Sequence, residues 1–457
     1  MTTFTKYFSL SLISSAVLFT GCSGGGGSAG NQALNIVEPA ELVSQSSLVV
    51  DDNETGLISA NTLLSWVSDW QENKPSHIRG RLFILQFNSA VSGNTTLNWV
   101  KHDDVNVFTY NAFDCCGSSP VRNDGVSNDP VSIPTGAMMD AMLQKTGINP
   151  EKDMIVMVMG ENDLSEKAYS KASRLWYSFA YWGIDTDHLA LMNGSATHQL
   201  HPTINSNVAA LSDVFTQNTS SYLNNGTSSV TDVRTDATII NSSMQDVMEI
   251  ASLEDKTGYL IVDSRSAAEY NGLVGAKTEE TTCGADGLSQ CFTAFDGRVR
   301  DAVNIDYKTT YNYNDQTTDL NADGVVDIRD SSSTFKTLGE LQRIYSDAGY
   351  RDGDLILAYC RTGTRVASNV FAQMQILGYP TTVYDGGWIQ WGKMAFAEDK
   401  NGQTMLDFSN PWRTDLPDYS ESVTMNPDSS MVQQINGLNP FGTNTRQIIE
   451  ADQDYKM

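Results

Sequence analysis

The chain has 457 residues, of which 40% are hydrophobic and 18% are charged, and this length predicts two to four domains. The hydrophobic fraction excludes a wholly disordered chain and a collagen-like one. With 29 Lys and Arg against 55 Asp and Glu, the net charge is −26, so no nucleic-acid partner is expected. The same charge disfavours anionic substrates unless their site carries its own cations.

Residues 1–21 have the features of a secretory signal peptide. Lys6 precedes an apolar stretch at 7–19, which is too short to cross a hydrocarbon core of about 30 Å. Cys22 follows directly after Thr-Gly and resembles the lipidated Cys of a bacterial lipobox. The resemblance implies a membrane-anchored lipoprotein of the bacterial cell envelope, at the outer membrane and facing the periplasm or the exterior. Residues 22–50 open with a Gly/Ser-rich run and are expected to form a tether. An ordinary signal peptide with a chance Cys is the alternative.

Two stretches, residues 51–200 and 236–400, repeat the same order of predicted elements. The first has predicted helices at 59–69, 136–147 and 172–183 and apolar strands at 81–86, 154–159 and near 193. The second has predicted helices at 242–251, 337–349 and 366–378 and strands at 258–263, 354–359 and near 385. Continuous apolar strands that alternate with helices predict an α/β fold with two tandem domains, each a parallel sheet with helices on both faces.

Two further segments are poor in such elements. Residues 201–235 are rich in Ser, Thr and Asn and are expected to be a linker between the domains. Residues 401–457 are rich in Asn, Pro and Asp, and we expect a C-terminal tail that drapes over the body or frays.

Cys360 follows the predicted strand at 354–359 and precedes a helix that begins at Val366. A strand–loop–helix turn aims successive backbone N–H groups at one point, and the helix N-terminus adds partial positive charge. Arg361 and Arg365 add two full charges, so the loop favours the thiolate and predicts an anion-binding cradle around a nucleophilic sulfur. A buried core Cys is the alternative, but two Arg and a Gly within five residues argue against it.

The second stretch resembles the rhodanese (sulfurtransferase) family. The resemblance rests on Asp263-Ser-Arg265, Glu269-Tyr270-x-Gly272, residues 297–304, the loop at 360–365, Asp385-Gly-Gly-Trp388 and Trp391. It implies that Cys360 attacks the outer sulfur of a donor such as thiosulfate and becomes a persulfide, which a thiol or cyanide then discharges. No organic cofactor is implied.

The resemblance also implies a role for each residue of the loop. Arg361 and Arg365 would be catalytic together with Cys360, and Asp263 and Arg265 would give structural support. The substrate-binding cradle would be formed by the backbone of Thr362, Gly363, Thr364 and Val366.

The first stretch resembles, more weakly, the non-catalytic half of a tandem rhodanese. Its best matches are residues 172–176 and 191–194. At the counterpart of Cys360, residues 160–163, it has acidic residues and no Cys, so this domain is expected to be catalytically silent.

Other chemistries are less consistent with the loop. By resemblance, a Cys-dependent phosphatase needs an Arg six positions after the Cys, where this chain has Val366. Relatives specific for 3-mercaptopyruvate usually carry Gly and Ser after the Cys, so Arg361 and Arg365 favour thiosulfate. A 3-mercaptopyruvate sulfurtransferase, a persulfide carrier or relay protein, and a binding module with vestigial catalysis stay as alternatives. A Cys–His hydrolase has no supporting motif, and His198 and His201 offer fewer ligands than a zinc site normally needs.

Residues 319–330 have the spacing of an EF-hand calcium loop. Gly324 falls at the sixth position, where the chain must turn sharply. The predicted ligands are Asp319, Asn321, Asp323, the Val325 carbonyl, Asp327 and Asp330. Asp in place of Glu at the last position resembles dockerin-type loops. A structural Ca²⁺ is therefore expected, with an acidic surface turn as the alternative.

Of the six Cys, four have no role assigned once Cys22 is assigned to lipidation and Cys360 to catalysis. Cys283 and Cys291 flank a short loop, and a local disulfide is their simplest pairing in a secreted protein. Cys115 and Cys116 are adjacent. A vicinal bridge is strained and rare, so free thiols and cross-domain pairing stay open.

Overall fold

The computed structural model describes part of the chain. The described residues are 34–43, 56–88, 98–117, 119–125, 128–129, 131–160, 166–273, 297–313, 324, 326, 333–393 and 444–457. The predicted signal peptide with Cys22, the Cys283–Cys291 pair and all predicted calcium ligands lie outside these ranges. A search of the described helices finds none with the length and apolarity that a membrane span requires.

Two five-stranded parallel sheets organise the described residues. The first has the order β2 (Gly56–Ile58), β9 (Leu189–Ser195), β8 (Met154–Met159), β3 (Leu82–Phe87), β5 (Val107–Asn111). The second has the order β12 (Asn241–Ser242), β18 (Thr381–Tyr384), β17 (Leu355–Tyr359), β13 (Tyr259–Asp263), β14 (Val303–Asn304). In both sheets the strand that comes first along the chain lies at one edge, beside the last. The second sheet therefore repeats the connections of the first, and the predicted α/β fold with two parallel sheets is confirmed.

The helices and smaller strands complete both units. The helices of the first unit are α2 (Ala60–Ser68), α3 (Trp70–Asn73), α4 (Ala112–Cys115), α5 (Gly136–Thr146), α6 (Glu166–Tyr181), α7 (Ala196–Gln199) and α8 (Leu211–Val214). Those of the second are α9 (Met244–Ser252), α10 (Ala267–Tyr270), α11 (Leu338–Asp347), α12 (Val366–Phe371) and α13 (Gly387–Lys393). Helix α12 continues as a π-helical turn over Ala372–Ile376. The short strands are β4 (Trp99–Val100), β6 (Arg122–Asn123), β7 (Asn128–Asp129), β10 (Phe215–Thr216), β15 (Tyr311–Tyr313) and β16 (Ser333–Phe335).

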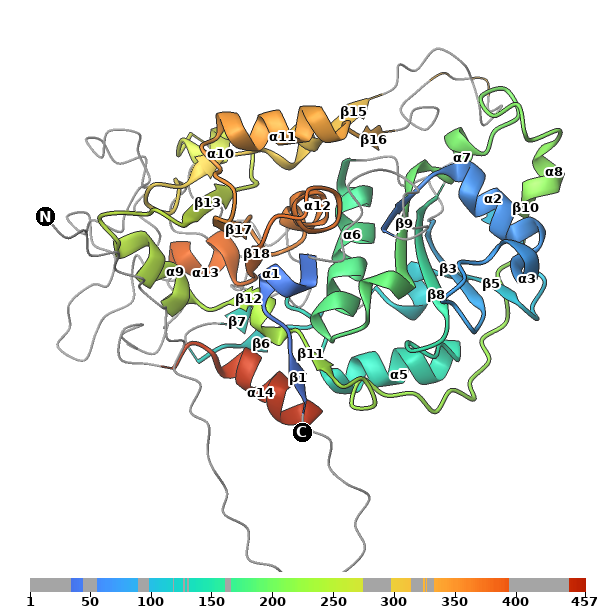
Figure 1. Ribbon diagram of the computed structural model, residues 1–457, viewed down its shortest axis with the longest axis horizontal. Coiled ribbons are helices and arrows are strands. Elements are labelled where there is room, and N and C mark those ends of the chain that lie inside the picture. The colour runs from blue at the N-terminus through green and yellow to red at the C-terminus, as the bar shows by residue number, and fades with distance from the viewer. Residues whose placement is uncertain are drawn as a thin grey trace, which may run out of the picture. The chain divides into compact units, whose positions relative to one another are not determined.

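Both faces of each sheet are buried, because successive strand residues point to opposite faces and are apolar on both. In β17, Ile356 and Ala358 join a core cluster that the two units share, whereas Leu357 and Tyr359 join a separate cluster of the second unit. The shared core contains α6 and α12, which lie side by side between the strands of the two sheets (Figure 1). Trp176 of α6 and Phe371 of α12 meet there edge to face, with ring centroids 5.1 Å apart.

The two units also exchange matching polar contacts. Asn193 of β9 accepts a hydrogen bond from the N–H of Phe335, three residues before α11 (2.9 Å). Asp385, directly after β18, accepts one from the N–H of Ile133, three residues before α5 (3.0 Å). Because each contact joins the last strand of one unit to the same point in the other, the repeat extends from sequence to packing.

The segments outside the sheets pack on the same body. Residues 201–235 contact the first unit. The N–H of Ser220 donates a hydrogen bond to the Thr109 carbonyl of β5 (2.8 Å). Near the N-terminus, β1 (Asn35–Ile36) pairs with β11 (Thr235–Asp236), and α1 (Pro39–Leu42) follows. The C-terminal helix α14 (Gln447–Lys456) contacts both units.

Helix α14 is held by charged groups of both units. Its Asp452 receives two hydrogen bonds from Arg122 of the first unit, both 2.7 Å long, and one from the Tyr181 hydroxyl (2.8 Å). Arg446, directly before the helix, pairs with Asp246 of the second unit (2.8 Å). The last segment of the chain therefore links the two halves.

Candidate active site

Cys360 lies at the carboxyl end of β17 and is fully buried. Since β17 pairs with β13 on one side and β18 on the other, the position of its end is well defined. The carbonyl oxygens of Cys360 and Arg361 accept hydrogen bonds from the N–H groups of Trp388 (2.8 Å) and Ile389 (3.1 Å) in α13. The loop is thus attached to the central strand behind it and to a helix beside it.

The loop after Cys360 contains backbone N–H groups that are not used in the described part of the fold. The N–H groups of Thr362, Gly363 and Thr364 find no hydrogen-bond acceptor among the described residues. Backbone N–H groups almost always have a partner, so three successive N–H groups without a described acceptor are donors to which an anion could bind. The start of α12, at Val366, adds its partial positive charge to the same loop. Three backbone donors and the start of a helix thus follow directly after Cys360.

Gly363 is required by its geometry. Its φ of +76° is left-handed, and a Cβ atom there would lie 2.1 Å from Oδ1 of Asp385 and 3.0 Å from Nη1 of Arg174. A side chain would therefore collide with Asp385 and crowd the buried Arg174, as well as strain the backbone.

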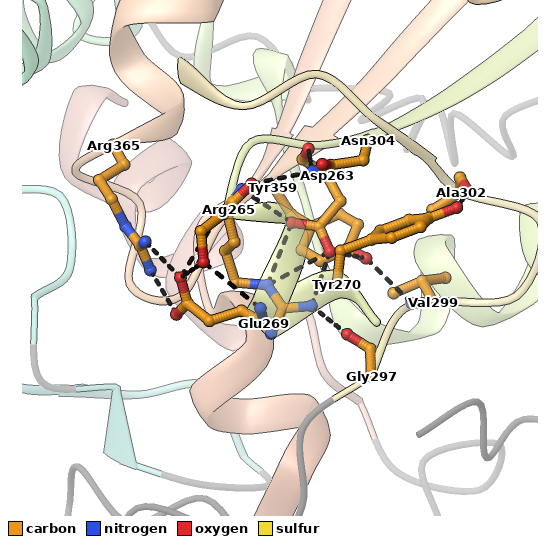
Figure 2. A network of polar contacts seen from close by, with 11 residues as sticks. Asp263, Arg265, Glu269, Tyr270, Gly297, Val299, Ala302, Asn304, Tyr359 and Arg365 are labelled. Carbon is orange, nitrogen blue, oxygen red and sulfur yellow. Dashed lines mark hydrogen bonds and ion pairs between the residues drawn. The ribbon is translucent and has the colours of Figure 1, made fainter. Parts of the chain in front are cut away.

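Arg365 is held by Glu269 of α10. Nη1 of Arg365 lies 2.6 Å from Oε2 of Glu269, and Nη2 lies 2.9 Å from Oε1, so the pair is bidentate (Figure 2). Burial would lower the pKa of Arg365, but the hydrogen bonds and charge of Glu269 outweigh it and raise the pKa, with a further contribution from Cys360. Burial would raise the pKa of Glu269, but Arg365 holds it well below its usual range. The Arg365 guanidinium is therefore a fixed cation near the sulfur.

Asp263 and Arg265 form a second, fully buried ion pair beneath the loop. Nη2 of Arg265 lies 2.6 Å from Oδ2 of Asp263 and also donates to the Gly297 carbonyl. The Tyr359 hydroxyl donates to Oδ2 of Asp263 (2.8 Å) and accepts from the N–H of Val299 (2.9 Å). Figure 2 shows this network beside the Arg365–Glu269 pair. Because Tyr359 directly precedes Cys360, the network fixes the residue from which the loop starts.

A third ion pair joins the loop to the first unit. Nη1 of Arg174, on α6, lies 2.6 Å from Oδ1 of Asp385, and Nη2 lies 2.9 Å from Oδ2. Nη1 also lies 3.4 Å from the Gly363 carbonyl oxygen. The roles of Arg174, Asp385 and Glu269 were not predicted from the sequence. All three lie in segments that carry the resemblance to the rhodanese family, but a motif in one sequence does not show which charged residues pair with each other.

The structure brings the predicted loop residues together. Arg361, Thr362 and Thr364 are half-buried, whereas Gly363 and Val366 are buried. The predicted metal ligands, Cys22, Cys283 and Cys291 lie outside the described residues. Cys115 and Cys116 form a disulfide with each other, a pairing that the sequence left open. Among the described residues, no three His, Cys, Asp or Glu side chains are grouped so that they could hold a metal.

The comparisons with known proteins concentrate on the second unit. Residues 246–394 match the family model of the rhodanese-like domain. A Haloferax volcanii protein named "Putative thiosulfate sulfurtransferase" is 32% identical over 146 residues, which cover 32% of this chain and 42% of that protein. The "Sulfur carrier protein TtuD" of Thermus thermophilus is 29% identical over 157 residues, covering 34% of this chain and 46% of that protein. The matched region therefore spans less than half the length of either curated relative.

Solved structures show a wider but weaker likeness. An anaerobic ergothioneine biosynthesis enzyme from Chlorobium limicola covers 80% of this chain and 72% of its own, with 16% identity and a TM-score of 0.49. SseA from Escherichia coli, described as a 3-mercaptopyruvate sulfotransferase, covers 73% of this chain and 99% of its own, with 14% identity and a TM-score of 0.43. Neither likeness bears on the substrate of this chain. The family model of the rhodanese-like domain therefore matches the part of the chain that contains the second parallel sheet and the Cys360 loop.

Proposed function

We propose that the protein is a sulfurtransferase that moves sulfane sulfur from a donor such as thiosulfate to a thiophilic acceptor through a persulfide on Cys360. The observation that carries the proposal is a buried Cys at the end of β17, followed by three N–H groups that have no described acceptor. Arg365 is fixed by its ion pair with Glu269, and its charge interacts with Cys360. A nucleophile inside an anion cradle suits a reaction in which both donor and leaving group are anions.

The first step is attack by the Cys360 thiolate on the outer sulfur of thiosulfate. The new S–S bond forms as the bond between the two sulfurs of thiosulfate breaks, and its electron pair leaves with sulfite. Arg361 and Arg365 offset the charge of the dianion and of the departing sulfite. The N–H groups of Thr362 to Val366 hold the outer sulfur of the persulfide, which is itself an anion.

In the second step an acceptor removes the outer sulfur and restores the Cys360 thiolate. With cyanide the product is thiocyanate, and with a thiolate it is a persulfide of that thiol. No organic cofactor takes part, because every bond is made and broken at sulfur. The partners are therefore a small sulfur donor and a thiol or cyanide acceptor.

Turnover with donor and acceptor tests this proposal. Purified protein should form thiocyanate from thiosulfate and cyanide, and Cys360→Ala should form none. Rates with thiosulfate and 3-mercaptopyruvate identify the preferred donor. If the wild type forms no product with either donor, the protein is not a sulfurtransferase of this type.

A persulfide carrier is the second candidate, favoured by the name of the Thermus relative. A carrier would load Cys360 once and pass the sulfur to a protein partner. It should therefore show a full single turnover with thiosulfate but slow thiocyanate formation, whereas an enzyme should sustain many turnovers.

We also propose a structural Ca²⁺ in the loop at 319–330. The proposal is supported by the ligand spacing and by Gly324, whose φ of +89° supplies the sharp turn that the sixth position needs. The β15–β16 hairpin pairs Tyr313 with Ser333, so it brings together the two ends of the segment that contains the loop. The ion would stabilise this segment rather than take part in the reaction.

We further propose that the protein is a lipoprotein of the bacterial cell envelope, anchored through Cys22. The support is the position of Cys22 after an apolar stretch and before a Gly/Ser-rich run. Membrane fractionation of the wild type and of Cys22→Ala tests the anchor. Release of the variant into the soluble fraction is expected, and equal membrane association of both would contradict it.

A further inference from the structure

Arg174 of the first unit reaches the Cys360 loop of the second. Its guanidinium pairs with Asp385 through both nitrogens, at 2.6 and 2.9 Å, and its side chain is only 7% exposed. Nη1 also approaches the Gly363 carbonyl to 3.4 Å, and Nη2 donates to the Val131 carbonyl of its own unit (3.0 Å). One buried side chain therefore touches the first unit, the residue after β18 and the cradle itself.

This contact breaks the symmetry of the repeat. The sequence alignment that pairs Ala172 with Ala367 places Asn369 at the position of Arg174. Asn369 donates to Ser264 and to Ile305, both in its own unit. The counterpart of Asp385 in the first unit is the neutral Asn193. The charged pair therefore exists only on the side of the interface where Cys360 lies, so it is not a general feature of the packing between units.

We propose that Arg174 is a positioning residue for the sulfur-transfer loop, supplied by the otherwise silent first unit. The inference rests on the proposed function and adds a role for the first unit, which completes the site by fixing Gly363 and neutralising Asp385. Its side chain acts on the loop and not on the reacting atoms.

The charges explain why the loop needs this residue. Oδ1 of Asp385 lies so close to Gly363 that a Cβ atom there would be 2.1 Å away. Without a cation beside it, this carboxylate would oppose both a thiolate at Cys360 and an incoming dianion. Burial would lower the pKa of Arg174, but Asp385, Tyr177 and Cys360 raise it, so the guanidinium keeps its charge within electrostatic range of the sulfur.

The test compares three variants of the full chain with the wild type. Arg174→Met removes the cation, Arg174→Lys keeps the charge without the two-nitrogen fork, and Arg174→Met combined with Asp385→Asn removes both charges. Arg81→Met is the control, because Arg81 pairs with Asp153 (3.6 Å) directly before β3 of the first sheet, whereas the Cys360 loop follows β17 of the second sheet. Single-turnover persulfide formation is measured over a range of thiosulfate concentrations, together with the melting temperature.

Arg174→Met should slow persulfide formation about tenfold, a factor that corresponds to ~1.4 kcal/mol, and raise the thiosulfate concentration at half-maximal rate. The rate of persulfide formation by Arg174→Lys should lie between the rates of Arg174→Met and the wild type. The double variant should be faster than Arg174→Met, since it removes the repelling carboxylate. Arg81→Met should melt at a lower temperature but form persulfide at the wild-type rate.

Two results would overturn the inference. One is persulfide formation by Arg174→Met at the wild-type rate, and the other is a double variant no faster than the single one. Alkylation of Cys360 by iodoacetate, mapped by peptide mass, decides the point independently of sulfur transfer. It should slow in Arg174→Met more than alkylation by neutral iodoacetamide, and an equal effect on both reagents contradicts a role for charge. If the wild type forms no persulfide, the proposed function fails, while the alkylation rates still decide the role of Arg174.

Discussion

Glu269→Gln removes the carboxylate that fixes Arg365 beside the Cys360 loop. In the wild type, both Glu269 oxygens accept hydrogen bonds from the guanidinium, at 2.6 and 2.9 Å. The Glu269 side chain is 7% exposed and the Arg365 side chain 21%, so solvent screens the pair little. Gln keeps the size of Glu and one acceptor oxygen but loses the charge and the second acceptor, so it tests the ion pair with little change in packing.

The cost of this change follows from the geometry. Breaking a buried ion pair by removing one partner costs about 3–5 kcal/mol, and one retained hydrogen bond to a charged group offsets ~1.5–3 kcal/mol of that loss. A net loss of about 2 kcal/mol is therefore expected in the free energy of unfolding. At ~2–4 °C per kcal/mol for a domain of this size, the melting temperature should fall by several degrees.

The pH dependence gives a sharper signature. The pKa of Glu269 in the folded protein is held well below its ordinary value of 4.5, so the folded state favours the deprotonated carboxylate more than the unfolded state does. The stabilisation is complete above the unfolded pKa and is lost as the pH falls through the folded pKa. The difference in melting temperature between wild type and Glu269→Gln should thus be constant at neutral pH and shrink below pH 4.5.

Thermal unfolding at a series of pH values measures this difference, and single-turnover kinetics measure the effect on the loop. Persulfide formation should slow, because Arg365 is no longer fixed. A melting difference that does not change between neutral and acid pH would refute the ion-pair account. An unchanged persulfide rate would refute the role of Glu269 in fixing Arg365.

Three further predictions concern other parts of the molecule. Gly363→Ala should abolish persulfide formation while circular dichroism stays that of a folded protein, because the Cβ meets Asp385; wild-type activity would show that the loop tolerates a side chain. Asp452→Asn should lower the melting temperature by the equivalent of about 3 kcal/mol, since Arg122 is left buried with a neutral partner; no change would mean that α14 does not stabilise the fold. A chelator should lower the melting temperature if residues 319–330 bind Ca²⁺, and added Ca²⁺ should restore it. Identical melting curves with and without the chelator would mean that this segment is an acidic surface turn that binds no Ca²⁺.

The long central strands could be predicted from the sequence because they are apolar on both faces. The predicted strand at 154–159 is observed as β8 with the same bounds, and β17 and β13 each begin one residue later than predicted. Edge strands such as β12 and β14 have only two residues each, which is too short for any periodicity, so they were not predicted. Helix α6 begins at Glu166, before the predicted start at 172. Its first turns are mostly polar, so the apolar pattern from which the helix was predicted does not reach them.

The loop around Cys360 could be predicted because its residues are contiguous. The charges that hold the loop could not, because their partners are distant in the sequence. Arg174 and Asp385 are separated by 211 positions, and Glu269 and Arg365 by 96. A single sequence shows that these residues are charged, but only the folded structure shows which pairs they form.

The central claim is that Cys360 carries the transferred sulfur. Mass spectrometry of the protein after incubation with thiosulfate tests it most directly. The account predicts an adduct about 32 Da heavier, the mass of one sulfur atom, that maps to the Cys360 peptide and disappears on addition of cyanide with release of thiocyanate. The absence of an adduct with any sulfur donor, or an adduct on Cys115, Cys116, Cys283 or Cys291 instead, would contradict it.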